Sequence, residues 1–246
     1  MQLAAAEKDY VLRKLLGLIT ARGGSRSVPR KNIALLAGRP LLVYTIEAAL
    51  ASQKLTRVIL STEDEEIARI GRESGAEVPF MRPDELAHDT SGSLEVAQHA
   101  VRWLDDNEGW RAEAVVILQP TSPLRRPEHI DKGFSIMDET GADTVVSVVE
   151  VPHNFSPYSL MQLQDGRLTD FWKEPLDFNH YRRQELPLFY ARNGPAVLIT
   201  RYKTLMEDNT FYGEHIAPLF MSWEDSHDID TPMDFEIVEW LLKRRK

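Results

Sequence analysis

The chain has 246 residues, which is long enough for one large α/β domain with a small additional subdomain. Its hydrophobic fraction of 43% and charged fraction of 27% are those of an ordinary globular protein. The formal net charge of −9 argues against non-specific binding to nucleic acid, and the absence of cysteine excludes disulfides, zinc–thiolate sites and thiol catalysis.

Neither end of the sequence indicates membrane attachment. No apolar run reaches the length of a membrane span, and residues 1–14 mix acidic and basic side chains without a signal-peptide core. The basic residues 243–246 could form a targeting patch, but we favour a helix C-terminus, where cations complement the helix dipole. We therefore expect a cytoplasmic protein with no membrane or nucleic-acid partner.

Apolar runs of strand length alternate with segments of helical periodicity along most of the chain. This alternation predicts a Rossmann-like α/β fold, in which a mostly parallel sheet carries helices on both faces. The predicted strands are residues 15–21, 57–61, 114–118, 144–149, 196–200 and 217–222. The predicted helices are residues 40–52, 64–74, 93–106, 128–139 and 232–243.

The alternation stops between residues 150 and 192, where the chain is polar, aromatic and interrupted by four prolines. We interpret this stretch as a small inserted hairpin or lid subdomain outside the main sheet. The predicted organisation is thus an N-terminal tail, residues 1–14, and a single domain, residues 15–246, that contains the insert.

A basic glycine–serine loop follows the first predicted strand: residues 20–32 read TARGGSRSVPRKN. Ligands of open α/β sheets bind beyond the carboxyl ends of the strands, and glycines let the backbone approach a phosphate closely. The loop is neither a Walker A sequence nor a G-x-G-x-x-G fingerprint. Its four cations favour phosphate binding over a solvated surface turn.

Residues 21–32 resemble the opening motif, roughly A-R-x-G-S-K-x-x-P-x-K-N, of the cytidylyltransferases that activate sialic acid and related nonulosonic acids. Arg26 stands where those enzymes usually have lysine. The resemblance implies that Arg22 and Lys31 bind the phosphates of CTP and act in catalysis, and that Asn32 contacts the ribose or the phosphates. The other nucleotide-binding residues that it implies in this loop are Gly23, Gly24 and Ser25.

A second motif, RPDELAHDTSGS at residues 82–93, resembles the R-P-x-x-L-A-x-D-x-x-x-S segment of the same family. By that resemblance Arg82, Ser91 and Ser93 surround the cytosine base, whose acceptors and amino group can be read by an arginine and hydroxyls. An alternative for Ser91 is that it caps the helix predicted from residue 93. The two interpretations are compatible.

The third motif, LQPTSPLR at residues 118–125, matches the family pattern at all eight positions and directly follows a buried strand. The resemblance implies that Gln119 contacts the sugar acid. For Thr121 and Ser122 we favour hydrogen bonds within the turn.

Two further segments resemble the sugar half of the family's site. Residues 182–187, RRQELP, include Arg183, and residues 190–196, YARNGPA, include Arg192 and Asn193. Many relatives carry an arginine two residues before the Asn-Gly pair, where this chain has Ala191. Arg183, Arg192 and Asn193 are therefore the candidates for sugar binding, and the sugar could be a modified nonulosonic acid of the legionaminic or pseudaminic type.

The segment DSHDIDTP at residues 225–232 supplies the candidate metal ligands. In an extended segment Asp228 and Asp230 point to the same side, and two carboxylates suit Mg²⁺, which completes its shell with water and substrate phosphates. The alternative is that one aspartate caps the last helix, although Thr231 before Pro232 already suits that position. The segment resembles the D-I-D-T motif of the family.

The resemblance covers residues 15–242 and implies the fold of the nucleotide-diphospho-sugar transferases. The reaction it implies is Mg²⁺-dependent: CTP and a nonulosonic acid give the CMP-sugar and pyrophosphate, with catalytic roles for Arg22, Lys31, Asp228 and Asp230. It also implies a homodimer, with the insert reaching toward the partner, although the insert could instead be a lid. The alternatives are another sugar nucleotidyltransferase (of the CMP-3-deoxy-octulosonate type, or using GTP or a sugar 1-phosphate), a metal-dependent glycosyltransferase, or a non-catalytic nucleotide-sugar sensor.

Overall fold

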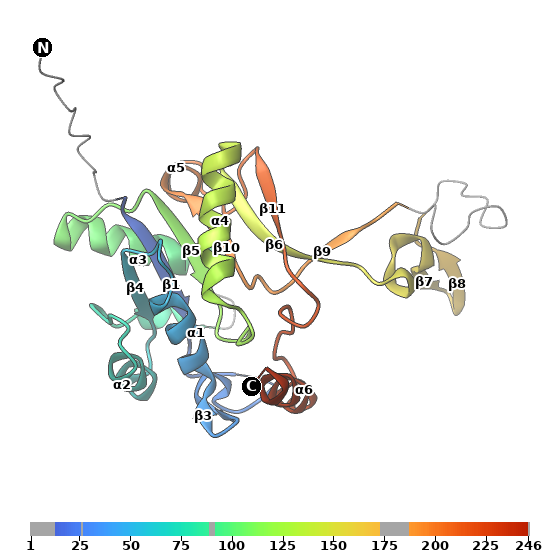
Figure 1. The fold of residues 1–246 in the computed structure, drawn as a ribbon, viewed down its shortest axis with the longest axis horizontal. Helices are drawn as coiled ribbons and strands as arrows, with labels where there is room; N and C mark the ends of the chain where they lie inside the picture. Colours follow the sequence, from blue (N-terminus) through green and yellow to red (C-terminus); the bar gives the residue numbers. More distant parts are fainter. Residues whose placement is uncertain (1–12, 26, 89–91, 173–186, 246) are drawn as a thin grey trace, which may run out of the picture.

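The computed structural model describes residues 13–25, 27–88, 92–172 and 187–245. A seven-stranded sheet forms the centre of the molecule, in the order β11-β6-β10-β5-β1-β4, with β9 also paired to β6 (Figure 1). Its strands are β1 (Leu15–Thr20), β4 (Arg57–Ser61), β5 (Ala114–Leu118), β6 (Thr144–Glu150), β9 (Tyr190–Arg192), β10 (Leu198–Arg201) and β11 (Ile216–Phe220).

The sheet is mixed, with five strands running in one direction. The pairings of β1 with β4, β1 with β5 and β6 with β11 are parallel. Strand β10 lies antiparallel between β5 and β6, and β9 is antiparallel to β6. The mostly parallel α/β fold predicted from the sequence is therefore confirmed, with two reversed strands in the half that holds β6.

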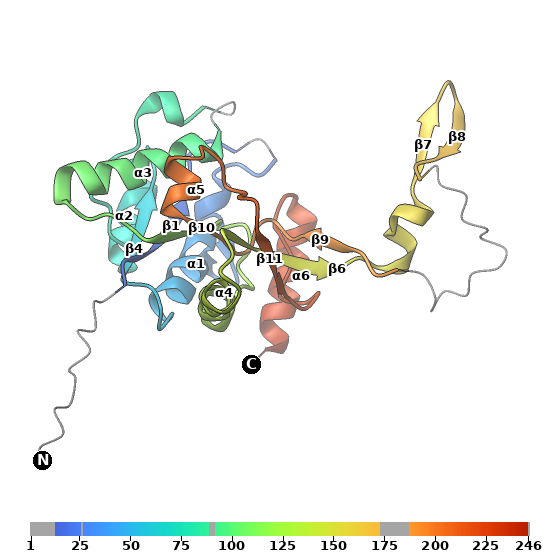
Figure 2. The same ribbon diagram turned by 90° about the horizontal axis from the view of Figure 1, so that it is seen from above.

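Helices cover both faces of the sheet (Figure 2). They are α1 (Leu41–Leu50), α2 (Glu65–Glu73), α3 (Ser93–Glu108), α4 (Pro127–Thr140), α5 (Tyr202–Met206) and α6 (Pro232–Arg244). Leu15 and Ile19 of β1 pack with side chains of α1, α2 and α4, whereas Leu16 and Leu18 pack with α3 and α5. Because successive strand residues point to opposite faces, a strand that is buried on both sides needs a continuous apolar sequence, as β1 has.

Helix α6 is held away from the main sheet by its own apolar cluster, in which Val238 packs with Leu36, Leu41, Leu124 and Ile229. It thus anchors the segment that precedes it to the first turn of α1. Short elements complete this region: the 3₁₀ turns η1 (Lys31–Ile33) and η2 (Asp84–Leu86), and the small hairpin of β2 (Leu35–Leu36) and β3 (Arg39–Pro40).

The stretch between β6 and β9 leaves the main sheet and projects from it (Figure 1). Its described part contains the 3₁₀ turns η3 (His153–Phe155) and η4 (Pro157–Ser159) and a separate antiparallel hairpin of β7 (Met161–Gln164) and β8 (Arg167–Asp170). We call residues 151–189 the insert. Within the described ranges, no helix is long and apolar enough to cross a membrane.

Candidate active site

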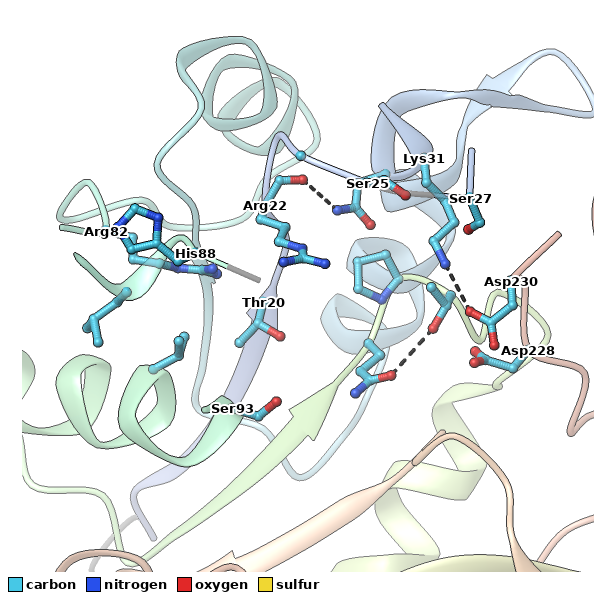
Figure 3. Close-up of a pocket in the computed structure, with 17 residues that line it drawn as sticks. Thr20, Arg22, Ser25, Ser27, Lys31, Arg82, His88, Ser93, Asp228 and Asp230 are labelled. Atoms are coloured by element: carbon cyan, nitrogen blue, oxygen red, sulfur yellow. Dashed lines mark hydrogen bonds and ion pairs between the residues drawn. The ribbon is translucent and has the colours of Figure 1, made fainter. Parts of the chain in front are cut away.

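A pocket of about 460 Å³ opens where β1, β4 and β5 end (Figure 3). Thr20 at the end of β1 and Gln119 directly after β5 line its floor. Its walls come from the loop after β1, from the segment around Arg82 and Ser93, and from Asp228 and Asp230 before α6. This is the edge at which open α/β sheets bind ligands, because the loops that follow neighbouring parallel strands converge there.

The loop after β1 lines the pocket with five of its six predicted nucleotide-binding residues, Arg22, Gly24, Ser25, Lys31 and Asn32. The side chain of Asn32 is buried, and its Nδ2 donates to the carbonyl of Arg22 at 2.9 Å. Asn32 therefore fixes the backbone of the loop as well as facing the pocket.

Gly23 has a different environment from the rest of this loop. Its N–H donates to Oε1 of Glu63 at 2.6 Å, and a Cβ at this position would lie only 2.6 Å from Oδ2 of Asp64. Among the described residues that line the pocket, Gly23 is absent. The structure thus assigns Gly23 to close packing against the start of α2, where only glycine leaves enough space.

Lys31 joins the first loop to the segment before α6. Its Nζ donates to the carbonyl of Ile229 at 2.8 Å and to Oδ1 of Asp230 at 3.1 Å, and its side chain is largely buried. The N–H of Ile229 donates in turn to the carbonyl of Thr121 at 2.8 Å. Ile229 is therefore held on both sides, and the aspartates that flank it both line the pocket.

Asp228 and Asp230 keep carboxylate oxygens available, because Asp234 accepts the hydrogen bonds at the start of α6. Asp234 accepts the N–H groups of Asp230 at 2.9 Å and Thr231 at 2.6 Å, together with the hydroxyl of Thr231. Burial acts to raise the pKa of Asp234, but these hydrogen bonds outweigh it and lower the pKa. The alternative that Asp228 or Asp230 caps the last helix is therefore wrong.

Asp228 and Asp230 fit a Mg²⁺ ion by the chemistry of their donors. Oδ1 of Asp228 accepts the hydroxyl of Ser122 at 3.2 Å and Oδ1 of Asp230 accepts Lys31, so each carboxylate retains a second oxygen. No cluster of three or more acidic or histidine side chains suited to a metal occurs in the described part of the chain. Two carboxylates are nevertheless enough for Mg²⁺, since this ion usually takes one or two from the protein and the remainder from phosphates and water.

Arg82 and Ser93 line the opposite end of the pocket. Arg82 is buried, with Nε donating to Oγ of Ser61 at 3.1 Å and Nη2 to its carbonyl at 2.5 Å, while Nη1 lies 3.8 Å from Oε2 of Glu63. Burial lowers the pKa of Arg82, Glu63 opposes this effect, and Arg22 adds to it. Arg82 is thus held by β4 while it faces the pocket.

Ser91 lies outside the described residues, so its predicted contact with cytosine is not described. The residue at the N-cap of α3 is Gly92, whose N–H donates to the carboxylate of Glu95 at 3.4 Å. The cap of this helix is therefore one residue later than the alternative for Ser91 assumed.

Gln119 lines the pocket between the two ends, as its position after β5 predicts. The hydroxyl of Thr121 donates to Oε1 of Gln119 at 3.4 Å, and that of Ser122 donates to Asp228. The bond of Thr121 lies within the turn of residues 119–122, which the Ser122 N–H closes on the Gln119 carbonyl, so the expectation is confirmed for Thr121. It is wrong for Ser122, whose hydroxyl bonds outside the turn, to Asp228.

The other candidates for sugar binding are not brought to this pocket. Arg192 is exposed, with its guanidinium 5.2 Å from the centre of the Tyr212 ring, and Asn193 is buried beneath the sheet edge. Neither is among the described residues that line the pocket. They are neighbours at the end of β9 and point to opposite sides, as consecutive residues of an extended chain do. Arg183 lies outside the described residues.

Sequence reasoning missed the role of Arg125, the last residue of the LQPTSPLR motif. Its guanidinium is buried below the pocket, donating to the carbonyls of Gln119 at 3.2 Å and Ala196 at 2.8 Å and to the hydroxyl of Thr45 at 2.7 Å. Burial lowers the pKa of Arg125 to about 9, and the charge of Asp228 opposes the shift. The motif shows that a basic residue follows an apolar one. It does not show that the side chain of Arg125 is buried, because burial depends on how the rest of the chain packs around it.

His88 was also passed over, although it lines the pocket beside Arg82 (Figure 3). The signal available in the sequence was its position inside the second motif, six residues after Arg82.

Comparison with known proteins decides the family. The family model described as cytidylyltransferase matches residues 16–239. The chain belongs to the cytidylyltransferase family. Two relatives match this cytidylyltransferase over nearly their whole length. The CMP-N,N'-diacetyllegionaminic acid synthase of Legionella pneumophila is 34% identical over 94% of this chain and 97% of its own. The flagellin modification protein B of Campylobacter coli is 29% identical over 95% of this chain and 97% of its own.

A third relative is longer. The N-acylneuraminate cytidylyltransferase of Escherichia coli is 34% identical over 94% of this chain, and this chain spans about half, 53%, of its length. Among solved structures, CMP:2-keto-3-deoxy-manno-octonic acid synthetase complexed with CTP superposes with a TM-score of 0.70, covering 95% of this cytidylyltransferase and all of that chain at 17% identity. This likeness confirms the fold predicted for the chain.

Proposed function

We propose that this cytidylyltransferase transfers CMP from CTP to a nonulosonic acid. The observation that carries the proposal is a single pocket in which the basic loop after β1 faces Asp228 and Asp230, with Gln119 between them. Relatives that match nearly the whole chain are named for the synthesis of CMP-sugars of this class. We infer the same class of substrate here.

In the proposed reaction the anomeric hydroxyl oxygen of the sugar attacks the α-phosphorus of CTP and its proton passes to water. The bond between the α-phosphorus and the oxygen that bridges to the β-phosphorus breaks, and pyrophosphate leaves with that oxygen. Arg22 and Lys31 bind the phosphates and offset the charge that develops on them. Arg82 and Ser93 hold the base, and Gln119 orients the sugar acid. Most of the acceleration then comes from positioning two anions in one basic pocket.

We propose that Asp228 and Asp230 hold Mg²⁺. When bound, this ion supplies positive charge to the phosphate oxygens of CTP. Ser122 and Lys31 orient the two carboxylates through the hydrogen bonds described above, and Ile229 fixes the backbone between them. We also propose a cytoplasmic location, with which the absence of cysteine from the sequence agrees.

The insert supports a second proposal, a homodimer. The described strands β7 and β8 pair only with each other, and a lone two-stranded hairpin is at best marginally stable in water. Its apolar side chains are open to solvent: Leu163 is 73% and Leu168 63% exposed. Exposed apolar patches of this kind mark protein–protein interfaces. We propose that the insert packs on a second copy of the chain.

Light scattering tests the dimer. The wild-type chain is expected at twice its 28.1 kDa mass, and Leu163→Asp with Leu168→Asp at the monomer mass with unchanged helix content. A wild-type monomer whose pyrophosphate release depends on the insert would instead support a lid.

The reaction is tested by pyrophosphate release with CTP, Mg²⁺ and a panel of N-acetylneuraminic, N,N'-diacetyllegionaminic, pseudaminic and 3-deoxy-octulosonic acids. Turnover with a nonulosonic acid, lost in Asp230→Ala and kept in Asp106→Ala on the exposed end of α3, is the expected result. Turnover only with 3-deoxy-octulosonate, GTP or a sugar 1-phosphate would contradict the substrate. CTP binding without pyrophosphate release would indicate a sensor.

A further inference from the structure

The sequence motif around Asn193 points to the sugar, but the structure gives this side chain a different set of partners. Asn193 is 5% exposed, and its Oδ1 accepts the hydroxyl of Ser147 in β6 at 2.5 Å. Its Nδ2 donates to Oγ of Ser226 at 2.7 Å and lies 3.4 Å from Sδ of Met221. Both ends of the amide thus have partners inside the protein, and Asn193 is not among the described residues that line the pocket.

Each partner of Asn193 is itself fixed. The hydroxyl of Ser147 accepts the N–H of Val197 at 2.9 Å, so it belongs to the sheet. The hydroxyl of Ser226 donates to the carbonyl of Ser222 at 2.7 Å, so it belongs to the turn that leads into Asp228. Asn193 and Ser147 are buried, and Ser226 is half-buried. Buried polar groups whose partners are all in place are rigid, because a displacement leaves one of them without a partner.

The geometry points to Asn193 as a positioning residue that fastens the segment of residues 222–230 to the sheet and so fixes Asp228 and Asp230 at the pocket. The inference rests on the proposed function for the role of those aspartates. Asn193 directly follows β9, the strand on which the chain returns from the insert, and β9 is hydrogen-bonded to β6. The segment that carries Asp228 and Asp230 is therefore held at two places: by Asn193 where the chain returns from the insert, and by Lys31 of the first loop.

The first measurement needs no turnover. Hydrogen–deuterium exchange of peptides from residues 222–230 is compared among wild type, Asn193→Ala and Ser226→Ala. Both variants lose the hydrogen bond between Asn193 and Ser226; Asn193→Ala also loses the bond from Ser147, and Ser226→Ala also loses the bond to the Ser222 carbonyl. Loss of the shared bond alone is worth about tenfold in the local opening equilibrium, so exchange in this segment is expected to rise at least about tenfold in both variants. Because the shared bond is the one that joins the segment to Asn193, the double variant is expected to rise by less than the product of the two single effects.

Ser135→Ala is the matched control, since it also removes a hydroxyl that donates to a carbonyl, that of Asp131 at 3.1 Å within α4. It is expected to leave exchange of residues 222–230 unchanged. Ser226→Ala keeps the bond between Asn193 and Ser147, so it tests the proposal even if Asn193→Ala fails to fold. A residue with only a global structural role would lower the melting temperature without singling out this segment.

The second measurement is the kinetic pattern with the acid that the chain turns over. Both variants are expected to raise the Mg²⁺ concentration for half-maximal rate by about tenfold, with little change in KM for the sugar. A rise in sugar KM for Asn193→Ala alone, with wild-type exchange of residues 222–230 in both variants, would overturn the inference and make Asn193 a sugar ligand. Absence of turnover with every acid would contradict the proposed function while leaving the exchange result interpretable.

Discussion

Replacing Arg125 by methionine is expected to destabilise the chain severely. The substitution keeps an unbranched side chain of similar length but removes the donors to the carbonyls of Gln119 and Ala196 and to the hydroxyl of Thr45. The carbonyl of Ala196 then remains below the pocket without this donor, whereas the carbonyl of Gln119 still accepts the N–H of Ser122 and the hydroxyl of Thr45. A hydrogen bond to a charged group is worth about 1.5–3 kcal/mol, so the loss of these bonds is expected to cost at least about 3 kcal/mol, which for a chain of this size lowers the melting temperature by roughly 10 °C.

The assay is thermal and urea unfolding followed by circular dichroism. Arg125→Lys keeps the charge but not the planar fork, so it is expected to recover only part of the loss. Arg126→Met is the control, because its exposed side chain shares Asp225 with Arg245 and should cost less than about 1 kcal/mol. If Arg125→Met unfolds within about 1 kcal/mol of wild type, the buried guanidinium does not hold this turn and the reasoning is refuted.

Two further changes test the packing around the site. Burial lowers the pKa of His99, with Arg102 and Arg82 adding to the effect, and burial lowers that of His129 against the opposing charge of Asp225. The folded state then binds fewer protons than the unfolded state, so stability is complete above about pH 6.5 and falls as the pH drops below that value. Melting temperatures from pH 8 to pH 5 should show this decline, and an equal decline in His99→Leu/His129→Leu would contradict the assignment. Gly23→Ala places a methyl 2.6 Å from Asp64 and should lower the melting temperature by about 2–10 °C. Gly24→Ala, with no atom within 4 Å of the new carbon, should leave the melting temperature unchanged. Equal melting temperatures of the two variants would refute the steric argument.

The elements that the sequence predicted best are those in which a buried face and a stop signal coincide. Strand β5 has the predicted bounds because five apolar residues lie between polar ones. Strand β4 also has the predicted bounds, with three apolar residues between Arg57 and Ser61. Helix α2 begins at Glu65, one residue after its predicted start, because Asp64 is the N-cap residue and its carboxylate accepts the N–H of Ile67. The reversed strand β10 was found as a strand, but its direction depends on pairing with β5 and β6, which local periodicity does not contain.

The residues of the candidate site also divide into those whose position the sequence predicted and those whose position it did not. Motif positions next to strand ends, such as Gln119 and Lys31, do line the pocket, because the α/β topology brings strand ends together. Asn193 matched a motif equally well, yet its side chain lies inside the protein, because it bonds to Ser147 and Ser226, contacts between distant positions that a motif does not contain. Helix α5 escaped prediction because it is a single short turn that follows β10 directly.

The bond from Lys31 to the carbonyl of Ile229 spans 198 positions of the chain. Contacts between such distant positions form late, because the chain must first lose the entropy of closing so large a loop. The part of the pocket built from the loop after β1, β4 and the start of α3 needs only the first half of the sequence. Its acidic wall also needs α6 to pack on Leu36, Leu41 and Leu124, so we expect the basic half of the pocket to form before the carboxylates that complete it.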